Sequence, residues 1–161
     1  MEGQILFITD GSASAGQAGE MAIGLANLWR VSLRAVYILD EGWRDILGDE
    51  WISTPAARAG FYRWLEGGLT GHAHDILQKF AQRAAESGVW VTTDIIVGKA
   101  EKTIAVLAES ATPLLLVLPN PNATLPPAEG GFQFNIRSLT QKIKCPVLIG
   151  PNPPRTNSTG L

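Results

Sequence analysis

Short apolar runs alternate along the chain with segments in which apolar residues recur at helical spacing. The apolar runs predict five strands, at residues 5–9, 33–39, 89–97, 114–118 and 145–149. Helical spacing predicts helices after Ser12, from about Thr70, over 99–110 and over about 134–143. Strands that are apolar on both faces and separated by helices favour a single-domain, doubly wound α/β fold around a parallel sheet.

Ligands of such folds bind at the carboxyl ends of the strands. In this sequence those ends fall at residues 9–12, 38–40, 97–99 and 118–122. Ser12 or Ser14 can cap the first helix. These four segments are therefore the first places to look for a functional site.

Residues 41–69 interrupt the alternation and read as an irregular, aromatic-rich insertion or lid within a domain that spans residues 1–150. This segment holds Trp43, Trp51 and Trp64. Packing of the tryptophans against the core is the favoured interpretation, and a ligand lid or a surface for a protein partner is the alternative. Residues 151–161 are rich in Pro, Asn, Ser and Thr and predict a disordered tail.

Composition narrows the class of protein. The 161 residues are 45% hydrophobic and carry a net charge of −2, so there is no broad basic face and nucleic acid is a poor partner. The apolar runs are too short to span a membrane, and no signal peptide is visible at the N-terminus. Cys145, the single cysteine, excludes an intrachain disulfide and fits a reducing compartment. We therefore expect a cytoplasmic protein.

No catalytic or metal-binding constellation can be read from the sequence. His72 and His74 are one residue apart, so a regular helix directs them to different sides and they cannot share a metal ion. Cys145 lacks a CxxC partner and more often packs than acts as a redox thiol. The two histidines also leave no Ser-His-Asp arrangement to propose.

Three segments resemble the universal stress protein family. They are the strand and turn Ile5-Leu6-Phe7-Ile8-Thr9-Asp10-Gly11-Ser12, residues 88–104, and the closing Cys145-Pro146-Val147-Leu148-Ile149. The resemblance implies the adenine nucleotide alpha hydrolase-like fold, a five-stranded parallel sheet in the order 3-2-1-4-5. It also implies a homodimer paired through the last strand, with Cys145, Val147 and Ile149 at the interface.

Many members of that family bind ATP through Gly-x2-Gly, nine residues, and then Gly-Ser or Gly-Thr after the fourth strand. In this register Pro119 and Asn122 stand at the first two glycines, and Gln133-Phe134 stands where Gly-Ser is expected. Gly130-Gly131 can stand in only with a shift. Pro119 and its neighbour Pro121 have no N–H to offer a phosphate, and no Lys or Arg occurs between residues 102 and 137.

The resemblance nonetheless names the residues of a nucleotide site, if one is retained. They are Thr9, Asp10, Gly11, Ser12, Ile38, Leu39, Pro119, Asn120, Asn122, Gly130 and Gly131. Asp10 is the strongest candidate, because the matching aspartate of nucleotide-binding relatives lies by the nucleoside. A carboxylate that accepts backbone N–H bonds in the turn is the equal alternative.

The sequence supports three functional hypotheses. The first is a non-enzymatic, dimeric stress-response or regulatory protein with a degenerate nucleotide site and no cofactor. The alternative is a switch that binds ATP or AMP, with slow or no hydrolysis. A weaker third is a flavodoxin-like cofactor enzyme that shares the parallel-sheet plan.

Overall fold

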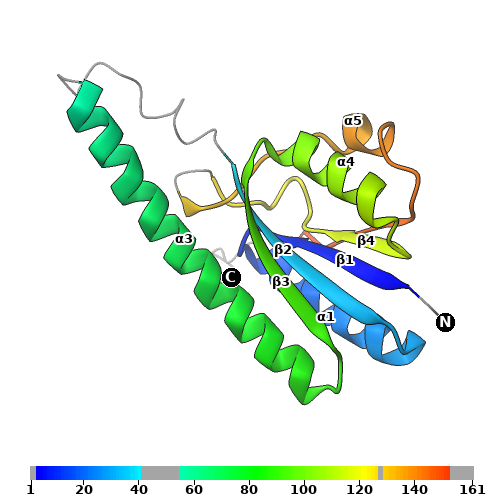
Figure 1. The fold of residues 1–161 in the computed structure, drawn as a ribbon. Coiled ribbons are helices and arrows are strands. Elements are labelled where there is room, and N and C mark those ends of the chain that lie inside the picture. The colour runs from blue at the N-terminus through cyan, green and yellow to red at the C-terminus, as the bar shows by residue number, and fades with distance from the viewer. Residues whose placement is uncertain (1–2, 41–54, 127–128, 153–161) are drawn as a thin grey trace, which may run out of the picture.

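The computed structural model describes residues 3–40, 55–126 and 129–152, and Figure 1 shows their arrangement. The strands are β1 (Gln4–Thr9), β2 (Ser32–Asp40), β3 (Val91–Gly98), β4 (Leu115–Leu118) and β5 (Val147–Ile149). The helices are α1 (Ala13–Trp29), α3 (Pro55–Glu86), α4 (Ala100–Ala111) and α5 (Ile136–Thr140).

The five strands form one parallel sheet in the order β3-β2-β1-β4-β5, which confirms the predicted fold class and strand order. β1 is central and is paired on both sides, with Phe7 opposite Ala35 of β2 and Val117 of β4. β3 and β5 lie at the two edges. The carboxyl ends of β1, β2 and β4 therefore meet in the middle of one end of the sheet.

Helices cover both faces of the sheet (Figure 1). Phe7 and Tyr37 point to one face, where α1 and α3 contribute buried residues such as Ala22 and Leu77. Leu6 and its neighbours on alternate positions point to the other face, against α4 and α5. Residues i and i+2 of a strand share a face, so the apolar runs of β1 and of β2 after Arg34 supply both cores.

The helix predicted from about Thr70 begins much earlier, at Pro55, so the prediction of an irregular segment is wrong for residues 55–69. Gly60, Gly67 and Gly68 lower the helix propensity of this stretch and hide its periodicity. Tertiary packing overrides that preference, because Leu65 and Leu69 pack against the core beneath α3. Residues 41–54, the rest of the predicted insertion, lie outside the described residues.

Smaller corrections concern the C-terminal third. α5 covers only 136–140 of the predicted 134–143, and β5 begins at Val147 rather than at Cys145. The tail prediction is wrong at Pro151, whose carbonyl oxygen accepts a 2.6 Å hydrogen bond from the Ser14 hydroxyl. Residues 153–161 lie outside the described residues. No helix in the described part of the chain is long and apolar enough to cross a membrane.

Candidate functional site

Asp10 follows β1 directly and is fully buried, with 0% of its surface exposed. Its Oδ1 accepts a 2.9 Å hydrogen bond from the backbone N–H of Ser12. Its Oδ2 accepts a 2.8 Å hydrogen bond from the backbone N–H of Leu125, which lies 115 residues further along the chain. A buried carboxylate needs such partners, and here both oxygens have them within the protein.

The turn between β1 and α1 is built around this carboxylate. Thr9 Oγ1 accepts a 3.1 Å hydrogen bond from the Gly11 N–H, and Gly11 adopts φ +80°, a conformation that favours glycine. Ser12 is the N-cap of α1 and its Oγ accepts from the Ala15 N–H at 3.2 Å, which confirms the predicted cap. The Thr9–Ser12 turn is therefore held by its own side-chain oxygens, which accept hydrogen bonds from nearby backbone N–H groups.

Tyr37 ties the segment after β4 to the same place. Its hydroxyl lies 2.9 Å from the carbonyl oxygen of Asp10 and 2.9 Å from that of Gly130, so one O–H is shared between two acceptors. Burial, reinforced by the negative charge of Asp10, raises the pKa of the Tyr37 phenol well above its usual value. The phenol therefore stays protonated and keeps donating over the physiological pH range.

The packing of the loop against Tyr37 and Leu125 requires glycine at positions 130 and 131. Gly130 has φ +87°, and a Cβ on it would lie 2.9 Å from the Tyr37 hydroxyl. A Cβ on Gly131 would collide with the backbone carbonyl of Leu125. The Gly131 N–H donates a 3.1 Å hydrogen bond to the Pro126 carbonyl, so this donor is used within the loop and not by a bound anion.

The hydrogen-bonding groups in the first half of the loop after β4 also find their partners within the protein. Ser14 Oγ accepts a 2.9 Å hydrogen bond from the Asn120 N–H, and Asn120 Oδ1 accepts one of 2.9 Å from the Asn122 N–H. Pro119 is buried and has no N–H. The prediction that Ser14 is an alternative cap is therefore wrong, since its hydroxyl joins this loop to α1.

The predicted nucleotide residues divide into two groups. The structure brings together those of the 9–12 turn and those of the loop at 119, 120, 122, 130 and 131, through the bonds of Asp10, Ser14 and Tyr37. Ile38 and Leu39 contribute side chains to the cores on opposite faces of the sheet and are almost fully buried.

The predicted interface residues lie at the far edge of the sheet. Cys145, Val147 and Ile149 are partly buried and pack against the core under α4 and α5. Burial raises the pKa of the Cys145 thiol, which disfavours the reactive thiolate. β5 is paired to β4 on one side.

The remaining candidates are spread over α3. His72 and His74 are exposed on this regular helix, and the described residues contain no group of three or more His, Cys, Asp or Glu suited to a metal ion. Trp64 is 73% exposed, so the core-packing interpretation is wrong for this residue. Trp43 and Trp51 lie outside the described residues.

Sequence reasoning missed the Tyr37 hydroxyl, the Leu125 N–H and the linking role of Ser14. Tyr37 carried a usable signal, because a hydroxyl in an otherwise apolar strand needs a buried partner. A backbone N–H such as that of Leu125 leaves no signal in the sequence, since every residue except proline has one.

A five-stranded parallel sheet in the order 3-2-1-4-5, with helices on both faces, is the fold of the universal stress proteins. The chain is similar to the structure of universal stress protein UspA from Lactobacillus plantarum, with 24% identity, TM-score 0.70, and 92% and 97% of the two chains covered. The resemblance seen in the sequence is thus confirmed at the level of the fold.

Two further similar structures carry nucleotides. One is a universal stress protein in complex with cAMP, with 19% identity, TM-score 0.59, and 91% of this chain and 94% of that one covered. The other is the universal stress protein from Archaeoglobus fulgidus in complex with dAMP, with 14% identity, TM-score 0.60, and 94% and 98% covered. The chain matches no protein family model and no curated protein.

Proposed function

We propose that this protein is a non-enzymatic stress-response or regulatory protein whose nucleotide pocket is closed by its own loop. One observation carries the proposal: both carboxylate oxygens of buried Asp10 are occupied by backbone N–H groups, those of Ser12 and Leu125. Asp10 is fully buried and the Leu125 N–H lies against its Oδ2, so a nucleoside reaches this carboxylate only if the loop that carries Leu125 moves away. Displacement leaves a buried donor unpaired, at a cost of about 1–3 kcal/mol.

The phosphate end of the pocket is equally unsuited to a ligand. Prolines at 119 and 121 remove two N–H donors, and the N–H groups of Asn120, Asn122 and Gly131 donate within the protein. Between residues 102 and 137 the sequence has no Lys or Arg to neutralise a triphosphate. ATP with Mg²⁺ would therefore find neither the amide cradle nor the cation that phosphate sites use.

A nucleotide-binding switch is the second candidate, and the similar structures favour it, since two of them hold cAMP and dAMP. In this alternative the loop opens, Asp10 accepts from the nucleoside, and the Gly130–Gly131 turn approaches the phosphates. AMP or ATP would be the ligand, with slow or no hydrolysis.

The proposal also covers the oligomeric state of the protein and its place in the cell. We expect a homodimer in the cytoplasm, paired through β5, with Cys145, Val147 and Ile149 at the interface. The edge position of β5 supports this, because an edge strand retains backbone groups for pairing with a second chain. Exposed Trp64 supports a contact between the aromatic segment and a protein partner.

Calorimetric titration of the purified protein with ATP and Mg²⁺, AMP, cAMP and dAMP tests the proposal. We expect no saturable heat at nucleotide concentrations up to about 1 mM, where binding free energies are only about −4 kcal/mol. Micromolar binding would overturn the closed-pocket proposal. Its loss in Asp10→Asn, with retention in the exposed control Asp94→Asn, would then establish the switch.

A further inference from the structure

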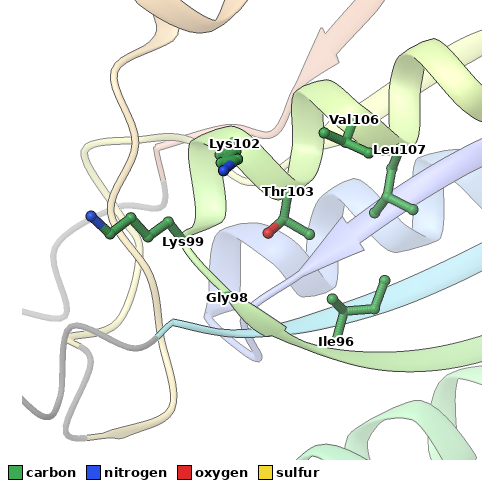
Figure 2. Close-up of a pocket in the computed structure, with 7 residues that line it drawn as sticks. All are labelled: Ile96, Gly98, Lys99, Lys102, Thr103, Val106 and Leu107. Atoms are coloured by element: carbon green, nitrogen blue, oxygen red, sulfur yellow. The ribbon is translucent and has the colours of Figure 1, made fainter.

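A hollow lies near the same end of the sheet as Asp10, at the edge of the sheet rather than at its centre. It is a groove of about 580 Å³ between the last residues of β3 and one side of α4. Figure 2 shows Ile96 and Gly98 on the strand, with Lys102, Thr103 and Val106 along the helix above them. Its volume lies within the range of small-molecule sites, roughly 300–1,000 Å³.

The helix side of the groove is explained by helical spacing. Lys99, Lys102, Thr103 and Val106 recur at intervals of three and four, so they share one face of the α4 segment. On the strand side, Gly98 leaves room where a Cβ would lie 2.9 Å from Thr103 Oγ1. The groove therefore has a basic end at the start of α4 and an apolar end further along it.

The basic end carries two ammonium groups, and the Asp40 carboxylate at the start of α4 accepts a 3.4 Å hydrogen bond from the Ala100 N–H. Neither the Lys99 nor the Lys102 ammonium group makes a hydrogen bond or ion pair within the described part of the chain. Glu101, the acidic residue between them, is held by Lys142 at 2.8 Å and by the Ser138 hydroxyl at 2.8 Å. Its carboxylate is thus committed to the α5 side of the helix.

The apolar end is open to solvent. Val106 is 55% exposed, Ile96 is half-buried, and Leu107 closes the floor from the helix side (Figure 2). Exposed aliphatic side chains that line a hollow commonly mark a ligand-binding surface. Apolar walls with a few polar groups at one end are the usual composition of a small-molecule pocket.

We propose that this groove binds a small amphipathic anion, a carboxylate or sulfonate with an apolar body. The anionic head lies at Lys99 and Lys102, where the Thr103 hydroxyl can donate to it, and the body lies along Ile96, Val106 and Leu107. The proposal is independent of the closed pocket at Asp10, because none of these six residues takes part in that network.

Fluorescence titration with 1-anilinonaphthalene-8-sulfonate, a sulfonate with an aromatic body, tests the proposal on the full chain. We expect saturable enhancement that decanoate displaces and decyltrimethylammonium, its cationic counterpart, does not. Lys102→Glu should weaken binding about tenfold, and Val106→Asp should weaken it by a similar factor. Arg137→Glu, the same charge reversal on an exposed residue of α5, should leave it unchanged.

Backbone amide shifts in a ¹⁵N-labelled sample locate the probe. Shifts concentrated in residues 96–107 support the groove, whereas shifts elsewhere would overturn it. Equal weakening by Lys102→Glu and Arg137→Glu would also overturn it, since that result means general attraction by net charge. Unchanged near-ultraviolet circular dichroism in each variant separates a lost contact from a lost fold.

Discussion

The hydrogen-bond network around Asp10 and the groove beside α4 lie near the same end of one sheet, yet the polar groups of the network are paired and those of the groove are exposed. At Asp10 the carboxylate, the Tyr37 hydroxyl and the loop N–H groups satisfy one another. Beside α4 the lysine side chains meet no partner in the described residues, and an aliphatic side chain faces solvent. The hydrogen-bonding groups of the first region are used within the fold, whereas those of the second remain exposed, where we propose that a ligand binds.

The difference shows why a fold alone does not define a binding site. In both regions the carboxyl ends of the strands place functional groups at the same end of the sheet, as parallel sheets do. The segment that follows each strand determines whether these groups are covered or left exposed. The segment after β4 is long enough to return to β1 and cover it, whereas α4 begins at Ala100, two residues after the last residue of β3.

Gly131→Ala should destabilise the loop that covers Asp10 more than any other change considered below. Its Cβ would collide with the Leu125 carbonyl, which is backbone and cannot rotate away, so we expect a loss of about 3 kcal/mol in the free energy of unfolding. Urea denaturation measures it. Gly16→Ala is the matched control, because nothing lies within 4 Å of its added Cβ on α1, and it should gain about 0.5–1 kcal/mol. Equal effects of the two changes would contradict the packing described at Gly131.

Asp10→Asn should destabilise the protein by about 2–3 kcal/mol. The asparagine side chain places an NH₂ group against one of two backbone donors, which leaves that N–H buried without an acceptor. Asp94→Asn, at an exposed ion pair with Arg34, should cost less than about 0.5 kcal/mol. Chemical denaturation of both variants gives the comparison, and a small effect at Asp10 would mean that the loop does not depend on the carboxylate.

Tyr37→Phe should lower the free energy of unfolding by about 1–2 kcal/mol at pH 7. The variant should then lose less stability than wild type as the pH rises above 10. Burial and the Asp10 charge raise the pKa of the folded phenol above the unfolded value of about 10. Its stabilisation is therefore complete below pH 10 and is lost as the pH rises above 10 toward the folded pKa. Urea denaturation at pH 8, 10 and 11 should show wild type and Tyr37→Phe converging, and parallel curves would contradict the assignment.

Glu101→Gln should have the smallest effect, because this surface cluster is solvent-screened. The hydrogen bonds from Lys142 and Ser138 lower the pKa of the Glu101 carboxyl, so its contribution is present above the unfolded pKa of about 4.3. That contribution disappears as the pH falls below this value. We expect a difference of about 0.5 kcal/mol or less at pH 7 and none at pH 2, measured by thermal denaturation.

The sequence predicted the sheet well because β1, β4 and most of β2 are short apolar runs separated by helical patterns, which is typical of a doubly covered parallel sheet. It predicted the start of α3 poorly, since three glycines between residues 55 and 69 obscure a helix that tertiary packing stabilises. At the site, Asp10 and Ser12 were predictable from turn chemistry. Their partner Leu125 was not, because its contribution is a backbone N–H brought from 115 residues away.

Titration of ¹⁵N-labelled protein with AMP decides whether the loop keeps Asp10 closed to a nucleotide. The backbone amide signals of Ser12 and Leu125 give the readout. These two N–H groups occupy the oxygens of Asp10, so they report any ligand that replaces them. We expect both signals to stay unshifted, and both amides to exchange slowly with solvent, up to about 1 mM AMP. Saturable shifts of both signals at micromolar AMP would contradict it.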